Sequence, residues 1–170
     1  AIATPILKAY ANGQRRRCGQ LTVRSIVERM PDRPYNESTF CHDNCRGNSS
    51  RRVIRERYDP EEKAVKARGQ TYCQVEIQCV AFGPVAIVTN PAELFSVYGI
   101  LIREASPFEV TIVSELSNGY CGYVPTLSAF RHGGYETHRT VFTHRLFKNA
   151  GDRIERLSIN QLKLAWQAQN

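Results

Sequence analysis

The sequence lacks the features that mark several specialised classes of protein. No apolar run approaches the roughly 20 residues that a membrane-spanning helix needs, so no transmembrane segment is expected. Six cysteines are too few for a disulfide-built fold of this length, and no internal repeat is visible. The chain begins at Ala1 with neither an initiator methionine nor a signal-like segment, which fits a processed protein or a fragment. Its 170 residues, 42% of them hydrophobic, suit one globular domain or one lobe of a larger one.

The excess of basic residues is confined to the first part of the chain. Residues 1–70 hold 15 Lys and Arg against 8 Asp and Glu, whereas residues 71–170 hold 8 of each. A basic segment can bind nucleic acid or an anionic membrane surface. Here the arginines are mixed with acidic residues and prolines and lack interleaved aromatics, which favours a solvated surface. Nucleic acid is therefore not an expected partner.

The regularity of the sequence changes near residue 70. Residues 1–69 are predicted to form a basic, loop-rich helical segment or an insertion. Within it we expect a short amphipathic helix at Leu21–Met30 and a charged helix at 51–67. Residues 31–50 are polar and are predicted to be a long loop that acts as a lid, an insertion or a covering over something absent from this chain. Residues 70–170 are predicted to form an α/β lobe.

Strand and helix patterns alternate along this second part. Thr71–Ala81 alternates in polarity and places Val75, Ile77 and Cys79 on one face, which predicts a strand. A turn at Gly83-Pro84 follows it. The other expected elements are strands at Val85–Thr89 and Phe108–Leu116, and helices at Pro91–Glu104, Pro125–Arg131 and Gly151–Ala165, the last with Ile154, Leu157, Leu164 and Ala165 inward.

Two of these strands are apolar nearly throughout. Val85–Thr89 is expected to be buried on both faces, and Phe108–Leu116 to lie centrally in the sheet. A helix between two strands acts as a crossover, which favours parallel pairing. The predicted fold class is α/β, with a mixed or mostly parallel sheet, flanking helices and a poorly regular N-terminal segment.

The turn Asn90-Pro91-Ala92-Glu93 has two interpretations. Asn is a good helix N-cap, Pro fits the first helical position and an acid at the third completes a capping box. Alternatively, Glu93 follows a buried strand at the edge of the sheet where α/β proteins bind ligands, and its carboxylate can bind a metal. The sequence leaves both interpretations open.

Glycines and tyrosines gather just after the second apolar strand, in Asn118–Tyr123 and Gly133–Glu136. Glycine lets the backbone approach another group closely, and a tyrosine hydroxyl can donate, accept or bind metal. If the two strands are parallel, Glu93 and Tyr123 meet across the top of the sheet. Single tyrosines are often core or surface residues, but three among these glycines favour a functional role.

In these segments the chain resembles the neutral/alkaline non-lysosomal ceramidase family, over about residues 70–165. The resemblance is carried by Pro91-Ala92-Glu93 after a buried strand, N-G-Y-x-G-Y-V-P-T at Asn118–Thr126, and G-G-Y-E at Gly133–Glu136. It corresponds to the C-terminal end of that family's catalytic domain. The family hydrolyses the amide bond of N-acylsphingosine at one zinc ion held by two His, one Glu and one Tyr.

The resemblance implies that Glu93 and Tyr123 are zinc ligands and that Tyr135 is a catalytic residue supporting the tetrahedral intermediate. It implies a ceramide-like lipid amide as substrate and favours an extracytoplasmic location. The family's two histidine ligands lie far upstream of the matched part, so the isolated chain is expected to be inactive unless an upstream segment or a second chain supplies them. The alternative is a non-enzymatic lobe that acts as a binding or interaction module.

Histidines and cysteines elsewhere give weaker signals. His138 and His144 would share a face if Thr137–Leu146 is extended, although surface or core positions are the usual ones for histidine. Cys41-His42-Asp43-Asn44-Cys45 has metal-like spacing but no second cysteine pair. On one face of a strand, Cys73 and Cys79 would lie about 20 Å apart, too far to form a disulfide.

Overall fold

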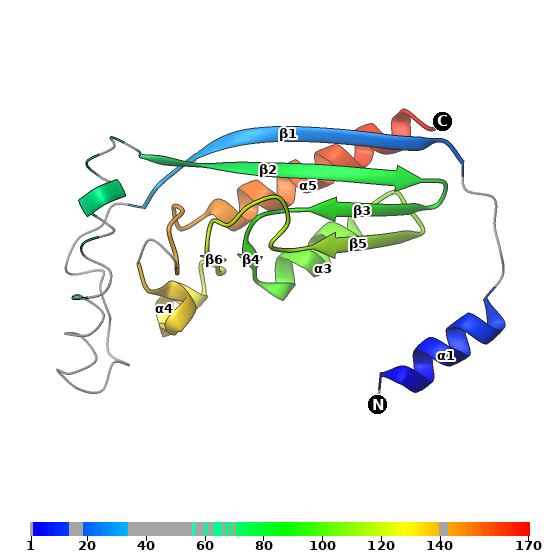
Figure 1. Cartoon of the computed structure of the whole chain (residues 1–170), viewed down its shortest axis with the longest axis horizontal. Coiled ribbons are helices and arrows are strands. Elements are labelled where there is room, and N and C mark those ends of the chain that lie inside the picture. Colours follow the sequence, from blue (N-terminus) through cyan, green and yellow to red (C-terminus); the bar gives the residue numbers. More distant parts are fainter. Residues whose placement is uncertain are drawn as a thin grey trace.

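The computed structural model describes residues 2–13, 19–33, 71–139 and 143–170, together with residues 56, 60, 63–65, 67 and 69. Its centre is a four-stranded sheet in the order β1-β2-β3-β5 (Figure 1). These strands are β1 (Leu21–Pro31), β2 (Tyr72–Phe82), β3 (Val85–Thr89) and β5 (Val110–Ser114). A second, two-stranded sheet pairs β4 (Glu93–Leu94) with β6 (Tyr123–Val124). The helices are α1 (Ala3–Asn12), α3 (Ser96–Glu104), α4 (Ala129–His132), α5 (Ala150–Gln167) and the 3₁₀ helix η2 (Tyr135–Thr137).

The large sheet is mixed. β1 pairs antiparallel with β2 and β2 antiparallel with β3, whereas β3 and β5 are parallel. The connection between the parallel pair contains α3, as the crossover argument predicts. The α/β fold class with flanking helices is thus confirmed.

One face of the sheet carries the hydrophobic core. Val75, Ile77 and Cys79 of β2 are completely buried on the predicted face. α5 lies against β1, β2 and β3, α3 lies against β5, and the two helices contact each other. Three of the four expected inward residues of α5 are buried, while Leu164 is half-buried and Leu162 is buried instead. The buried Cys73, Cys79 and Cys121 are free thiols, in agreement with the predicted separation of the first two.

The two helices of this layer meet at a glycine. A Cβ atom on Gly151 of α5 would lie only 2.2 Å from Cζ of Tyr98 in α3. The Tyr98 hydroxyl donates a hydrogen bond to Oδ1 of Asp152 at 3.1 Å. Gly151 therefore permits a close approach that a larger residue would prevent.

The prediction of a helix at Leu21–Met30 is wrong. These residues form β1, which pairs with β2 over its whole length, from Leu21 opposite Phe82 to Pro31 opposite Tyr72. Several residues here are good helix formers, but β2 offers a long partner strand, and α5 covers the side that buries Met30. Tertiary pairing overrides local helix propensity at this position.

The two predictions about the apolar strands are also wrong. β5 is the terminal strand of the four-stranded sheet, and Val110 and Ile112 are each 49% exposed. β3 buries only Ala86 and Val88, while Val85 and Ile87 are half-buried. The reason is that α3 and α5 contact each other and so cover the same face of the sheet.

The remaining expectations concern less regular parts of the chain. The turn at Gly83-Pro84 is confirmed, and α4 is shorter than the helix predicted at Pro125–Arg131. The predicted loop at 31–50 and helix at 51–67 lie mostly outside the described residues. The Cys41–Cys45 motif lies entirely outside them. Among the described residues, none of the helices has both the length and the apolar character required to cross a membrane.

Candidate functional site

The chain turns after β3 instead of starting a helix. Asn90 is buried, and its Oδ1 accepts a hydrogen bond from the N–H of Ala92 at 3.0 Å. This side-chain turn leads into β4, and α3 begins only at Ser96, after Phe95 as N-cap. The capping-box interpretation is therefore wrong, and Glu93 belongs to β4, a strand of the small second sheet.

Backbone hydrogen bonds hold the glycine- and tyrosine-rich loop along this turn. The N–H of Cys121 donates to the carbonyl of Pro91 at 3.1 Å. Two residues further, the N–H of Glu93 donates to the carbonyl of Gly122 at 3.0 Å. Gly122 has φ +80°, a conformation that side-chain-bearing residues rarely adopt. The glycine thus allows the loop to run closely beside β4.

Glu93 and Tyr123 lie side by side as a result. They are register partners in the parallel pairing of β4 with β6. A hydrogen bond to Glu93, followed by burial, raises the pKa of the Tyr123 phenol to about 12. Tyr123 is therefore a neutral donor to the carboxylate at neutral pH.

A second tyrosine contacts the same carboxylate. The Tyr120 hydroxyl donates to Oε1 of Glu93 at 3.0 Å. Partial burial, and then this hydrogen bond, raise the pKa of Tyr120 well above its ordinary value. Glu93 is thus the common acceptor for two phenols.

Tyr135 completes the aromatic group. Its ring meets that of Tyr123 edge to face, with centroids 5.7 Å apart, and the residue is 61% exposed. It follows Gly133 and Gly134, which have φ values of +74° and +130°. These conformations favour glycine and turn the chain back toward Tyr123.

Glu115 is an additional acidic residue near the group. It directly follows β5. Burial raises the pKa of Glu115, the charge of Glu93 raises it further, and a hydrogen bond from the backbone of Leu94 opposes this. Glu115 is not among the predicted site residues, although, like Glu93, it lies just beyond the end of one of the two parallel strands.

His138 and His144 do not lie on one face of a common strand. The N–H of His144 donates to the carbonyl of His138 at 3.1 Å, so the backbones of these two residues lie beside each other. His138 is half-buried, and its ring centroid lies 6.3 Å from that of Tyr135. Thr137 is the last residue of η2, and the condition for a shared face, one extended segment from Thr137 to Leu146, is not met.

His144 is a core histidine, the usual environment for this residue. It is completely buried, and Nη1 of Arg33 lies 3.2 Å from its Nδ1. Because a guanidinium only donates, Nδ1 accepts and the ring hydrogen is on Nε2. Burial, and then the charges of Arg33 and Arg139, lower the pKa of His144 to about 3. The imidazole is therefore neutral.

Glu93 and Tyr123 form a pair of oxygen donors rather than a complete metal site. Across the described parts of the chain, no three His, Cys, Asp or Glu side chains cluster in a way that could hold a metal ion. Carboxylate and phenol oxygens are suitable zinc ligands, but structural and catalytic zinc sites use three or four protein ligands. The pair would therefore need donors from elsewhere.

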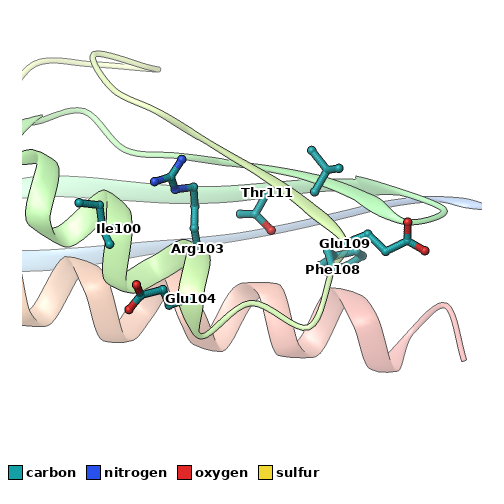
Figure 2. Close-up of a pocket in the computed structure, with 7 residues that line it drawn as sticks. Ile100, Arg103, Glu104, Phe108, Glu109 and Thr111 are labelled. Atoms are coloured by element: carbon teal, nitrogen blue, oxygen red, sulfur yellow. The ribbon is translucent and has the colours of Figure 1, made fainter. Parts of the chain in front are cut away.

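Two open cavities lie along α3 and the outer edge of β5. One has a volume of about 410 Å³ and is lined by residues that include Ile100, Arg103 and Thr111 (Figure 2). The other, of about 510 Å³, extends to Ser96 and Glu115. Neither is lined by Glu93 or Tyr123, so the donor pair sits outside these cavities.

Comparison with known proteins gives a likeness in fold. Neither a protein-family model nor the sequence of a curated protein matches the chain. Among solved structures, the chain is similar to neutral ceramidase from Pseudomonas aeruginosa, with a TM-score of 0.55 and 17% sequence identity. The match covers 88% of this chain and 29% of that one. The chain thus shares a ceramidase-like fold with one part of a considerably longer protein.

Proposed function

We propose that this chain is part of a zinc-dependent amidohydrolase acting on a ceramide-like lipid amide. In this proposal Glu93 and Tyr123 are metal ligands, and Tyr135 is a catalytic residue beside them. The observation that carries the proposal is the register pairing of Glu93 with Tyr123. The fold likeness to a neutral ceramidase supports the choice of substrate class.

The donor pair has suitable chemistry for a divalent cation. Glu93 provides a negative charge, and the hydroxyl that Tyr123 directs at it could be redirected to a cation. When bound, zinc would act as a Lewis acid toward the amide and lower the pKa of water to about 7. Glu93 and Tyr123 would hold the ion, while the rest of the chain fixes their backbones.

Tyr135 has a position suited to a hydroxyl donor. It packs against the Tyr123 ring and remains largely exposed, so its hydroxyl can reach a bound substrate. A fixed donor aimed at a developing oxyanion can lower the barrier by about 3 kcal/mol. This is the role that we assign to Tyr135.

The remaining ligands would be two histidines from an upstream segment or a second chain. We therefore expect the isolated chain to bind zinc weakly and to have little or no amidase activity. Addition of imidazole should partly replace the missing histidines. Cobalt is a useful substitute for zinc because its visible spectrum reports tetrahedral coordination.

The test is a cobalt titration of the full chain with and without imidazole. Wild type should develop tetrahedral cobalt bands only when imidazole is present, and Glu93→Gln and Tyr123→Phe should each lose them. Glu136→Gln is the matched control, since its carboxylate acts on Tyr123 only through its charge. Bands that are unchanged in Glu93→Gln and Tyr123→Phe would contradict the metal-ligand assignment. Tight zinc binding with amidase turnover in wild type, both lost in Glu93→Gln, would show that the chain is active without added ligands.

The second candidate function is a non-enzymatic interaction module. It is favoured by the exposed apolar residues Val110 and Ile112 on β5, the terminal strand of the sheet. Such a strand can pair with another polypeptide. This function predicts partner binding that Ile112→Lys abolishes and Glu93→Gln leaves unchanged, measured by co-purification and light scattering. A binding activity that depends on Glu93 would instead favour the metal-site proposal.

A further inference from the structure

Tyr120 hydrogen-bonds to the proposed ligand Glu93 through a carboxylate oxygen. Its hydroxyl lies 3.0 Å from Oε1, across 27 positions of sequence. An ionised carboxylate has two oxygens and about four acceptor positions. The hydrogen bond from Tyr120 therefore uses one of these positions and leaves others for further contacts of the carboxylate.

The backbones of both residues are fixed relative to each other. Cys121, directly after Tyr120, is buried and donates its N–H to the carbonyl of Pro91. The N–H of Glu93 in turn donates to the carbonyl of Gly122. These two bonds place the Tyr120 side chain beside Glu93 before any ligand is present.

The exposure of Tyr120 argues against a mainly structural purpose. The residue is 49% exposed, so water can compete for the hydroxyl, and the bond adds little to folding stability. The main effect of the bond is on the direction of the Glu93 carboxylate. Groups that hydrogen-bond to a metal-ligating side chain commonly orient it in this way.

We propose that Tyr120 is a positioning residue that fixes the Glu93 carboxylate so that Glu93 and Tyr123 form a preset pair of metal ligands. This inference rests on the proposed function, because it gives Glu93 the role of a ligand. Tyr120 itself would not contact the metal or the substrate.

The test compares Tyr120→Phe with Tyr10→Phe in the full chain. Tyr10 lies on α1 and is 89% exposed, so its variant controls for loss of a hydroxyl. The first measurement, without metal, uses NMR three-bond couplings to report the side-chain rotamer of Glu93. The second is the cobalt affinity of each variant in the presence of imidazole.

We expect Glu93 to occupy one rotamer in wild type and in Tyr10→Phe, and several in Tyr120→Phe. Cobalt affinity should fall roughly 10-fold or more in Tyr120→Phe alone, as for other residues that orient ligands. A single Glu93 rotamer in Tyr120→Phe, or averaging without any loss of affinity, would overturn the positioning role. Failure of wild type to bind cobalt would refute the proposed function, and the rotamer measurement would still decide whether Tyr120 orients Glu93.

Discussion

Glu93 stands opposite Tyr123 in a parallel ladder that is only two residues long. So short a ladder is stabilised by the backbone hydrogen bonds at its two ends. The carbonyl of Gly122 accepts from Glu93 on one side, and that of Val124 accepts from Phe95 on the other. The pairing brings together a carboxylate and a phenol that hydrogen-bond to each other, which has consequences that can be measured.

The first prediction concerns the ionisation of Tyr123. Replacing Glu93 with Gln removes the charged acceptor that is the main cause of the raised pKa, so the pKa of Tyr123 should fall from about 12 toward the ordinary value near 10. Tyrosine ring-carbon NMR across alkaline pH measures it. Glu136→Gln should lower the pKa less, because Glu136 acts only through its charge. An unchanged value in Glu93→Gln would contradict the hydrogen bond.

The same shift predicts a dependence of stability on pH. A phenol whose pKa is higher in the folded than in the unfolded state stabilises the fold below the unfolded pKa. This contribution should be complete below about pH 10 and lost as the pH rises toward about 12. Urea unfolding of wild type and Tyr123→Phe over this range should converge at the upper end. Parallel curves would show that the contact does not contribute.

The second prediction concerns His144. The pKa of His144 is about 3 in the folded chain and about 6.5 in the unfolded chain. As the pH falls below about 6.5, this histidine therefore binds a proton in the unfolded state while it is still neutral in the folded state. The free energy of unfolding should therefore fall by up to about 1.4 kcal/mol for each pH unit below that value. Urea unfolding at pH 7 and pH 5 should show this loss in wild type and a smaller one in His144→Gln. His132→Gln, at an exposed histidine, should behave as wild type. Equal losses in all three proteins would refute the assignment.

The third prediction compares two glycines in helices. Gly151→Ala should destabilise the protein by about 1–3 kcal/mol, because its Cβ would displace the buried Tyr98 ring and disturb the bond to Asp152. Gly99→Ala in α3 has no atom within 4 Å of the new Cβ, so helix propensity alone should stabilise it by up to about 1 kcal/mol. Thermal and urea unfolding measure both. The close packing of α3 on α5 would be disproved if both variants were stabilised.

The fourth prediction compares two ion pairs, one formed by Asp32 directly after β1 and one formed by Glu28 within β1. Arg145 binds both carboxylate oxygens of Asp32, at 2.9 and 3.0 Å, and both side chains are largely buried. Asp32→Asn should therefore cost about 3 kcal/mol, because it leaves a buried guanidinium without its countercharge.

Glu28→Gln is the matched control for that variant. Glu28 pairs with Arg153 at a more exposed position, so its loss should cost about 1 kcal/mol or less. Both values come from urea unfolding at neutral pH. A similar cost for the two substitutions would show that burial does not distinguish the pairs.

The spacing of apolar residues predicted the elements in which that spacing matches the period of a strand or a helix. β2 alternates in polarity and buries the expected face, and most of the inward side of α5 follows from helical spacing. The juxtaposition of Glu93 and Tyr123 followed from a rule of sheet geometry, since each lies beyond the end of one of two parallel strands.

Other features depend on partners distant in sequence. β1 contains good helix formers, and only its pairing with β2 makes it a strand. The position of β5 at the end of the sheet depends on strand order, which its apolar residues do not encode. Asn90 is suitable both for capping a helix and for a side-chain turn, and the turn prevails because β4 then pairs with β6. The contact between Tyr120 and Glu93 depends on a loop path that no periodicity describes.

The register of β1 with β2 also determines how the chain tolerates insertions and deletions between these two strands. Pro31 lies opposite Tyr72, so the intervening residues 32–71 leave and re-enter the sheet at neighbouring points. β1 and β2 both continue past the level of Thr89, the last residue of β3, which pairs with Gln78. Pro31 and Tyr72 therefore lie on the side of the sheet where β3 leads into the turn before Glu93. Doubling the length of a closed loop costs only about 0.6 kcal/mol. Evolution could therefore lengthen, shorten or exchange this connection with little effect on the pairing of β1 with β2.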